Sequence, residues 1–238
     1  MTPLATDQRR LLPAAPAWRG LTPSPEILLD SAAVRAALTE TAAAAASRSE
    51  IRPAAVAVLR QAHAEGRAMI AAEIAAAPRE AHRAIHDYAW LIDRIVELTL
   101  DLAARWLHPL ATPTASERIS ALAVGGYGRA EMAPFSDVDL LFVTPYKQTP
   151  WGESLIESVL YCLWDLRLKV GQAVRTVDEC LRQARAGAAG GGVDCRAGGG
   201  RVEQRLRRPR QPAPERDGWR KAALVSSQRR QTTSLPVR

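Results

Sequence analysis

Two aspartates, Asp137 and Asp139, lie two residues apart at the start of an apolar segment, residues 138–143, that is typical of a β-strand. Side chains two apart on a strand share a face, with Cα atoms about 6.5–7 Å apart. Two carboxylates held in this way repel each other but can share a divalent cation, and Mg²⁺ suits a site that phosphate oxygens complete. Considered alone, an Asp-x-Asp pair is more often a solvated strand end, so the flanking sequence has to decide.

A glycine pair, Gly125 and Gly126, follows an earlier apolar segment, residues 119–124, and ten residues separate Gly126 from Asp137. Glycines lack Cβ atoms and therefore allow backbone N–H groups to approach a phosphate closely. The sequence GGYG is by itself more often a tight turn. It is not a dinucleotide-binding fingerprint, because Glu131 stands where the third glycine belongs, and the P-loop pattern is absent.

The combination is more informative than its parts. A strand, Gly-Gly, ten residues and then Ser-Asp-x-Asp at the next strand resembles the DNA polymerase β-like nucleotidyltransferase superfamily. The blocks VGGYGRAEMAPFSDVDLLFV, PYKQTPWGE, LYCLWDLRLKVG and RTVDEC resemble the N-terminal catalytic region of the bacterial PII uridylyltransferase/uridylyl-removing enzymes. This resemblance spans roughly residues 121–184. It implies Mg²⁺-dependent transfer of UMP from UTP to a tyrosine of the PII nitrogen-signalling protein, with release of pyrophosphate.

The resemblance also implies a role for each residue of the motif. Gly125 and Gly126 would hold the triphosphate, and Asp137 and Asp139 would form the catalytic pair that binds Mg²⁺. Ser136 precedes the pair as in the family pattern, where it would either hydrogen-bond a phosphate or orient the strand.

Basic partners for the triphosphate are less well defined. Arg129 is the cation nearest the glycine turn, although Glu131 can pair with it. Three further candidates, each as readily a solvated surface cation, are Lys147, Lys169 and Arg175. Members of the superfamily usually carry a third acid on a later strand. The next predicted strand here has none, so that ligand stays open.

The elements that must position these residues indicate an α+β fold, in which a helical region, residues 24–110, precedes a polymerase β-like core with a small mixed sheet, residues 117–185. Ser24-Pro25-Glu26 is typical of a helix start. We expect breaks near Arg52-Pro53 and Ala77-Pro78. The clearest helix covers residues 81–106, where apolar residues recur at steps of three and four, and His108-Pro109 ends it.

The core is expected to contain three strands and two helices. The strands are residues 119–124, 138–143 and 169–175. Thr149-Pro150 caps a helix that runs to about residue 168, and Thr176 with Glu179 forms a capping box that opens a short one.

Composition bounds the class of protein. The chain is 47% hydrophobic but only 5% aromatic, and its many alanines favour helix. No apolar run is long enough for a membrane span or a secretory signal, and the three cysteines lack metal-ligand spacing, so we expect a cytoplasmic protein. His82 and His86 are four residues apart without the glutamate of a zinc-binding motif, which favours a solvated helix face.

The basic charge belongs to the C-terminal segment. Residues 1–181 contain 18 Lys and Arg against 21 Asp and Glu, whereas residues 182–238 contain 14 against 4. Residues 186–238 are rich in Gly, Arg and Pro and lack an apolar period, so we expect this tail and residues 1–23 to be disordered. The abrupt change near Arg185 suggests a tail translated out of frame and an incomplete core. Translation of the underlying DNA in the other two frames tests this hypothesis.

Three alternatives stay open at this point. The chain is an inactive or regulatory nucleotide-binding remnant, or another polymerase β-like nucleotidyltransferase, or a nucleic-acid-binding protein that uses the basic tail. The last is the least favoured, because that tail offers only Trp219 for base stacking. The phosphohydrolase and ACT domains of the longer family members are not recognisable, so UMP removal and glutamine sensing are not expected.

Overall fold

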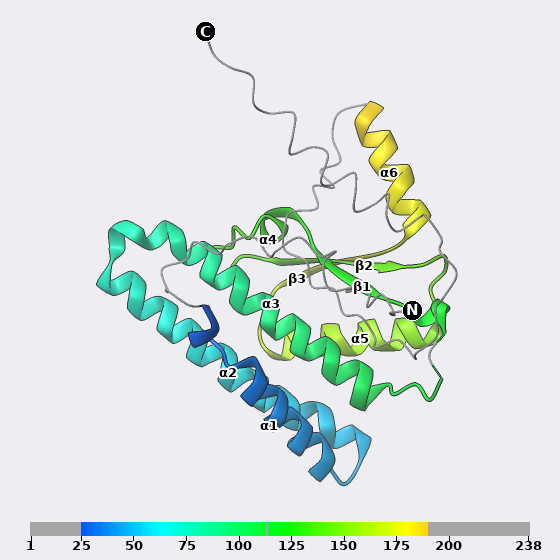
Figure 1. Ribbon diagram of the computed structural model, residues 1–238, viewed down its shortest axis with the longest axis horizontal. Helices are drawn as coiled ribbons and strands as arrows, with labels where there is room; N and C mark the ends of the chain where they lie inside the picture. The colour runs from blue at the N-terminus through cyan, green and yellow to red at the C-terminus, as the bar shows by residue number, and fades with distance from the viewer. Residues whose placement is uncertain (1–24, 113, 190–238) are drawn as a thin grey trace, which may run out of the picture.

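The computed structural model describes residues 25–112 and 114–189, and it is mostly helical with one three-stranded sheet (Figure 1). The predicted α+β class is confirmed. The expectations for residues 1–23 and for most of the tail lie outside the described residues, although helix α6 continues to Ala189, beyond the predicted end of order at Arg185. In chain order the elements are η1 (Pro25–Ile27), α1 (Ser31–Ala44), α2 (Arg48–Ala76), η2 (Pro78–Arg83), α3 (Ala84–Leu102), η3 (Ala103–Leu107), η4 (Ala115–Glu117), β1 (Ser120–Ala123), α4 (Gly125–Gly128), β2 (Val138–Thr144), α5 (Pro150–Asp165), β3 (Val170–Thr176) and α6 (Val177–Ala189).

Helix α2 corrects one sequence-based prediction. It continues through Pro53 without a break, and the chain instead turns at residues 45–47, between α1 and α2. Proline in a helix interior costs about 3 kcal/mol, because it removes a hydrogen bond and crowds the preceding turn. Buried side chains on both sides of Pro53, among them Ile51 and Val56, favour a continuous helix by packing into the core. The second predicted break is confirmed, since α2 ends at Ala76.

Helix α3 is the central helix of the molecule. Its predicted apolar stripe is confirmed, and even Thr99 within it is satisfied, because its Oγ1 donates to the carbonyl of Ile95 at 2.7 Å. A final π-helical turn, η3, ends at Leu107 as His108-Pro109 predicted. Helix α1 is fastened to α3 by Arg35, which forms ion pairs with Asp101 and Glu97.

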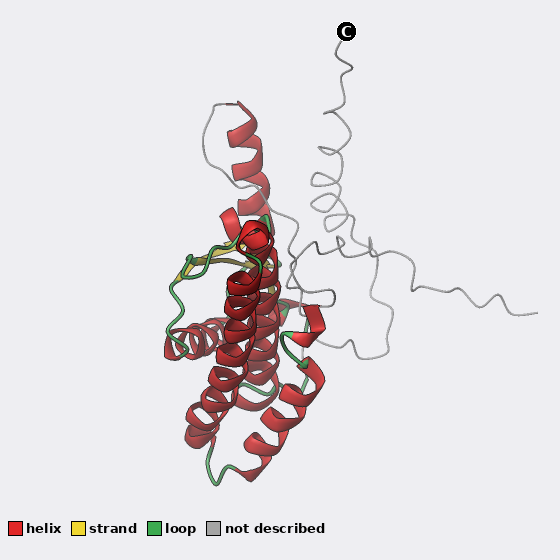
Figure 2. Cartoon of the chain, turned by 90° about the vertical axis from the view of Figure 1, so that its left-hand side faces the viewer, coloured by secondary structure: helices red, strands yellow, loops and turns green. Residues whose placement is uncertain are grey.

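The sheet has the order β1-β2-β3, with β1 antiparallel and β3 parallel to β2. On β2, Leu140 and Phe142 are buried in the same core as α3 and α5, whereas Asp139 and Leu141 on the opposite face are half-buried. Figures 1 and 2 show the long helices on one side of the sheet and α6 projecting away from them. Asp139 therefore faces away from the helical layer.

The predicted helix starts in the core are confirmed. Thr149 caps α5, its Oγ1 accepting from the Gly152 N–H at 3.1 Å, although α5 ends at Asp165, three residues earlier than expected. In the capping box before α6, the Thr176 N–H donates to Glu179 Oε2 at 2.7 Å, and the Glu179 N–H donates to Thr176 Oγ1 at 3.2 Å.

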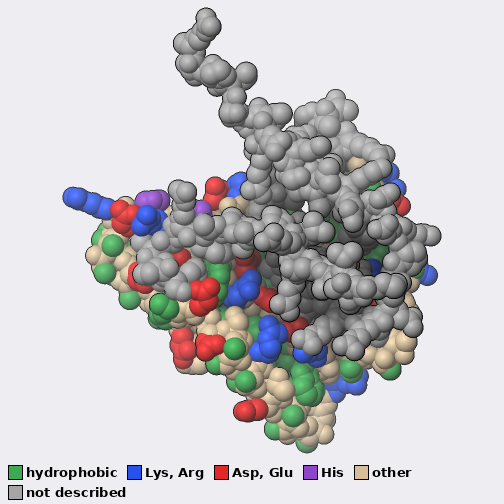
Figure 3. Space-filling model, viewed as in Figure 1, with side chains coloured by type: hydrophobic (Ala, Val, Ile, Leu, Met, Phe, Trp, Pro, Cys, Tyr) green, Lys and Arg blue, Asp and Glu red, His purple; other side chains and the backbone are tan. Residues whose placement is uncertain are grey.

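One hydrophobic core joins the helical region and the sheet, with residues from α1 to α5 in contact. On the described part of the face drawn in Figure 3, acidic and basic side chains are interspersed, as is usual for solvated helix faces. Among the helices of residues 25–112 and 114–189, none combines the length and the hydropathy that a membrane span requires.

Candidate active site

The glycine turn is packed directly against Asp139. Strand β1 leads into the one-turn helix α4, and the Val124 N–H donates to the carbonyl of Asp139 at 3.0 Å. Gly125 has φ +61°, and a Cβ there would lie 2.9 Å from Asp139 Oδ2. A side chain at position 125 would therefore be strained and would also collide with the carboxylate.

Gly171 encloses the same carboxylate from strand β3. It pairs with Asp139 in the parallel register, and a Cβ at Gly171 would approach Asp139 Oδ1 closer than 3.0 Å. The Asp139 carboxylate thus occupies the space that two glycines leave, one on each neighbouring segment. Sequence reasoning missed Gly171, because only the strand register identifies it.

Asp137 lies one residue before β2 and is exposed, whereas Asp139 is half-buried. The Val138 N–H between them donates to the carbonyl of Lys169 at 2.7 Å, which fixes the start of β2 against the segment before β3. Ser136 is half-buried, and its N–H donates to the carbonyl of Ala133 at 3.0 Å. The structure therefore brings the serine and both aspartates to the end of the sheet where the glycine turn lies.

Phe135, which directly precedes Ser136 in the chain, is a further exposed residue. Its side chain is 74% exposed and its φ is +73°. The Arg67 guanidinium of α2 lies 4.9 Å from the centre of its ring, a cation–π contact that links α2 to the loop before Ser136. Neither residue was predicted from the sequence.

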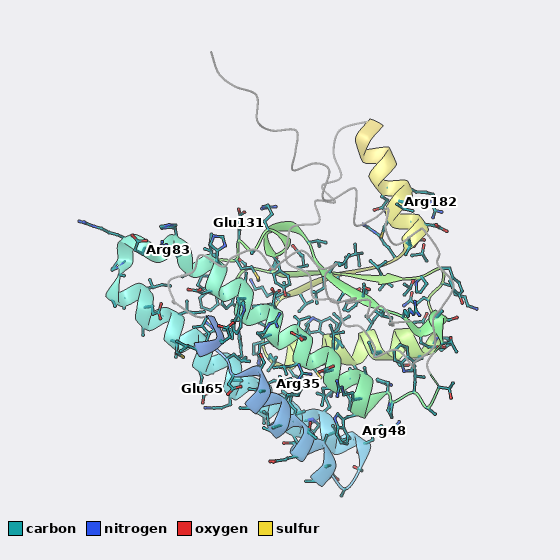
Figure 4. All side chains as sticks on the ribbon, in the orientation of Figure 1. Arg35, Arg48, Glu65, Arg83, Glu131 and Arg182 are labelled. Carbon is teal, nitrogen blue, oxygen red and sulfur yellow. The ribbon has the colours of Figure 1, made fainter. Side chains whose placement is uncertain are left out.

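Arg129 braces the turn itself. Its Nη1 donates to the carbonyl of Gly125 at 3.1 Å, and its Nε donates to Glu131 Oε2 at 2.9 Å. Glu131 lies beside α4, at the opposite end of the sheet from Arg182 on α6 (Figure 4). The alternative that Glu131 pairs with Arg129 is therefore confirmed, while the assignment of Arg129 to the triphosphate stays a prediction.

The other basic candidates lie at different ends of the sheet. Lys169 is exposed beside the start of β2, at the aspartate end. Arg175 pairs with Val143, four residues along the strand from Asp139 or about 13 Å away. Lys147 follows the far end of β2. Of the three, Lys169 is the best placed to meet a phosphate at the aspartates.

Helix α3 holds the glycine turn and the segment that follows it at three points. His86 Nδ1 lies 2.8 Å from the carbonyl oxygen of Ala130, and the Met132 N–H donates to the carbonyl of Ile85 at 3.3 Å. The expectation that His86 lies on a solvated helix face is therefore wrong, because it is half-buried and hydrogen-bonded. The third contact is a buried hydrogen bond from the Tyr127 hydroxyl to Asp93 Oδ1 at 2.7 Å.

The residues present fit a divalent cation held by two carboxylates. Asp137 and Asp139 would supply hard oxygen ligands, and Gly125 and Gly171 leave the space that the Asp139 carboxylate occupies. No cluster of three or more His, Cys, Asp or Glu side chains suited to a metal occurs within residues 25–112 and 114–189. Beyond the two aspartates, phosphate oxygens and water would have to complete the coordination shell.

Comparison with known proteins shows the family to which the chain belongs. The model of the family described as "Glutamate-ammonia ligase adenylyltransferase" matches residues 18–167, which include the glycine turn and both aspartates. The chain belongs to this nucleotidyltransferase family. No solved structure matches it.

Curated relatives similar in sequence to this chain carry the name "Bifunctional uridylyltransferase/uridylyl-removing enzyme". The protein of Ruegeria pomeroyi is 55% identical over 158 residues, which are 66% of this chain and 17% of the relative. That of Cereibacter sphaeroides is 51% identical over 172 residues, 71% of this chain and 18% of the relative. The resemblance to these enzymes is confirmed, and the chain spans less than a fifth of their length.

Proposed function

We propose that this chain carries a site for the transfer of UMP from UTP to a tyrosine of the PII signalling protein, in the cytoplasm and with Mg²⁺. The proposal rests above all on one observation: the turn of Gly125 and Gly126 packs against Asp139 within a chain that is 51–55% identical, over 158–172 residues, to uridylyltransferase/uridylyl-removing enzymes. The curated relatives favour UTP over ATP as the nucleotide, although the family description names an adenylyltransferase.

The residues suggest how the reaction is assisted. Backbone N–H groups of the turn at Gly125 and Gly126 would bind the triphosphate. Asp137 and Asp139 would hold Mg²⁺, which supplies charge neutralisation of the phosphates and of the departing pyrophosphate. The tyrosine oxygen attacks the α-phosphorus in line, the bond from that phosphorus to the oxygen bridging it to the β-phosphate breaks, pyrophosphate leaves, and the hydroxyl proton passes to water. The protein contributes by orienting the triphosphate and the acceptor.

The experiment uses the purified full chain with α-labelled UTP, Mg²⁺ and PII. We expect label on PII, and an Asp137→Ala, Asp139→Ala double variant should lose about a hundred-fold or more of the rate, because it lacks both carboxylates proposed to hold Mg²⁺. Asp165→Ala on α5, an exposed aspartate of the helical layer whose carboxylate pairs with Arg52, is the matched control and should retain the rate.

The outcomes separate the alternatives. Binding of UTP without transfer would favour a nucleotide-binding remnant. Label from ATP in place of UTP would favour adenylyl transfer, as the family description names it. Transfer that survives in the double variant would contradict the assignment of the two aspartates.

A further inference from the structure

The third residue of the glycine turn points into the core. Tyr127 follows Gly125 and Gly126 directly, its side chain is only 2% exposed, and it reaches α3. Its hydroxyl donates at 2.7 Å to Asp93, a carboxylate that is itself 5% exposed. A residue of the phosphate-binding turn is therefore tied to the helical region through a buried hydrogen bond.

A carboxylate in this position is costly to bury. Desolvation raises the pKa of Asp93 to about 6, against the opposing effect of the Tyr127 hydrogen bond, and burial with the Asp93 charge raises the pKa of Tyr127 well above its usual range. Two apolar side chains of similar volume could fill this space without that penalty. The bond has a fixed direction and length, which apolar packing lacks, so it can define where the turn lies relative to α3.

The other contacts of α3 extend the same attachment. His86 lies seven residues, or about two helical turns, before Asp93 and therefore on the same face of α3. Its contact with the Ala130 carbonyl and the Ile85–Met132 hydrogen bond hold the end of the segment that Tyr127 holds at its start. Ala130 has φ +59°, an unfavourable conformation for a residue with a side chain, and such conformations persist where the surroundings impose them.

We propose that the Asp93–Tyr127 hydrogen bond positions the Gly125–Gly126 turn for the triphosphate, so that Asp93 and Tyr127 are positioning residues of the transferase site. The inference rests on the proposed function and extends the site to a helix outside the sheet. The turn then stays in the geometry that UTP requires before UTP binds, and the bond contributes to the affinity for UTP more than to that for PII.

The test compares variants that break the bond with one that keeps it. Tyr127→Phe removes the donor, Asp93→Leu removes the acceptor, and Asp93→Asn retains an oxygen that can accept from the tyrosine. Tyr161→Phe, an exposed tyrosine on α5, is the matched control. In the full chain we expect KM for UTP to rise about five-fold or more in Tyr127→Phe and Asp93→Leu, the effect of one lost hydrogen bond. KM for PII should stay unchanged, and Asp93→Asn should restore KM for UTP to within about two-fold of the parent.

A second readout does not depend on activity. Hydrogen exchange of the backbone amides of residues 125–131, measured without nucleotide, should be faster in Tyr127→Phe than in Tyr161→Phe. If Tyr127→Phe only lowers the urea midpoint while KM for UTP and this exchange stay at the parent values, the positioning role is overturned. If neither the parent nor any variant transfers UMP, the proposed function fails. In that case, unchanged amide exchange in Tyr127→Phe would overturn the positioning role as well, whereas faster exchange would support it.

Discussion

At the scale of single residues, the candidate site depends on two side chains that are absent. Gly125 and Gly171 each leave the space that an oxygen of the Asp139 carboxylate fills. The first could be predicted from the sequence, because Gly-Gly after a strand is a recognisable pattern. The second could not, because it follows from the alignment of β3 with β2, which depends on the chain between them.

Gly171→Ala tests this arrangement. The added methyl group would approach Asp139 Oδ1 closer than 3.0 Å, so the carboxylate has to move. We expect the rate of UMP transfer to fall about ten-fold or more, equivalent to ~1.4 kcal/mol of transition-state stabilisation, with a change in stability below about 1 kcal/mol because alanine is tolerated in strands. Mn²⁺ binding, followed by the relaxation of water protons, should weaken in parallel. Gln172→Ala, at the neighbouring exposed residue, is the control. Equal Mn²⁺ binding by the two variants would refute the proposed crowding of Asp139.

At the scale of elements, sequence patterns predicted the class and order well. The stripe of α3, the three strands and both helix caps of the core lie within a few residues of their expected positions, because each depends on local periodicity or on a local hydrogen bond. The continuous α2 was not predicted, since its stability depends on side chains that it packs against elsewhere in the chain. His86 was misjudged for the same reason, because its partner is distant in sequence.

Pro53→Ala measures how far packing overrides local preference in α2. Pro53 is exposed, so the replacement leaves the core unchanged while restoring a backbone N–H to the helix. We expect the free energy of unfolding to rise by about 1–3 kcal/mol, less the small entropy advantage that proline gives in the unfolded chain. Ala57→Gly, one turn later and also exposed, provides a calibration and should lower it by about 1 kcal/mol. A Pro53→Ala protein with unchanged or lower stability in urea would mean that the helix adapts to proline at no cost.

At the scale of the whole molecule, a single core joins the helical region to the sheet, so a change in the helices reaches the site. The separation into residues 24–110 and 117–185 stays a prediction. Two buried titratable groups lie within this shared core and respond to acid in opposite ways. Desolvation lowers the pKa of His63 on α2 to about 4, with a further contribution from Arg67, and raises the pKa of Asp93 on α3 to about 6.

Protonation of His63 should oppose the folded state in acid. Because its pKa in the fold lies below the ordinary value of 6.5, the unfolded chain takes up a proton first as the pH falls. Its contribution to stability is complete above about pH 6.5 and is lost progressively down to about pH 4, amounting to at most about 3 kcal/mol. Asp93 acts in the opposite sense over a similar range, since the folded state binds its proton first, so the net change in the parent protein is smaller than either contribution.

His63→Leu removes the first contribution and should leave a protein whose stability in urea rises as the pH is lowered from 6.5 to 4.5. His82→Leu, at an exposed histidine, should keep the pH profile of the parent. Parallel pH profiles of stability for His63→Leu and the parent would show that protonation of His63 does not destabilise the fold in acid. The proposed offset between His63 and Asp93 would then be wrong.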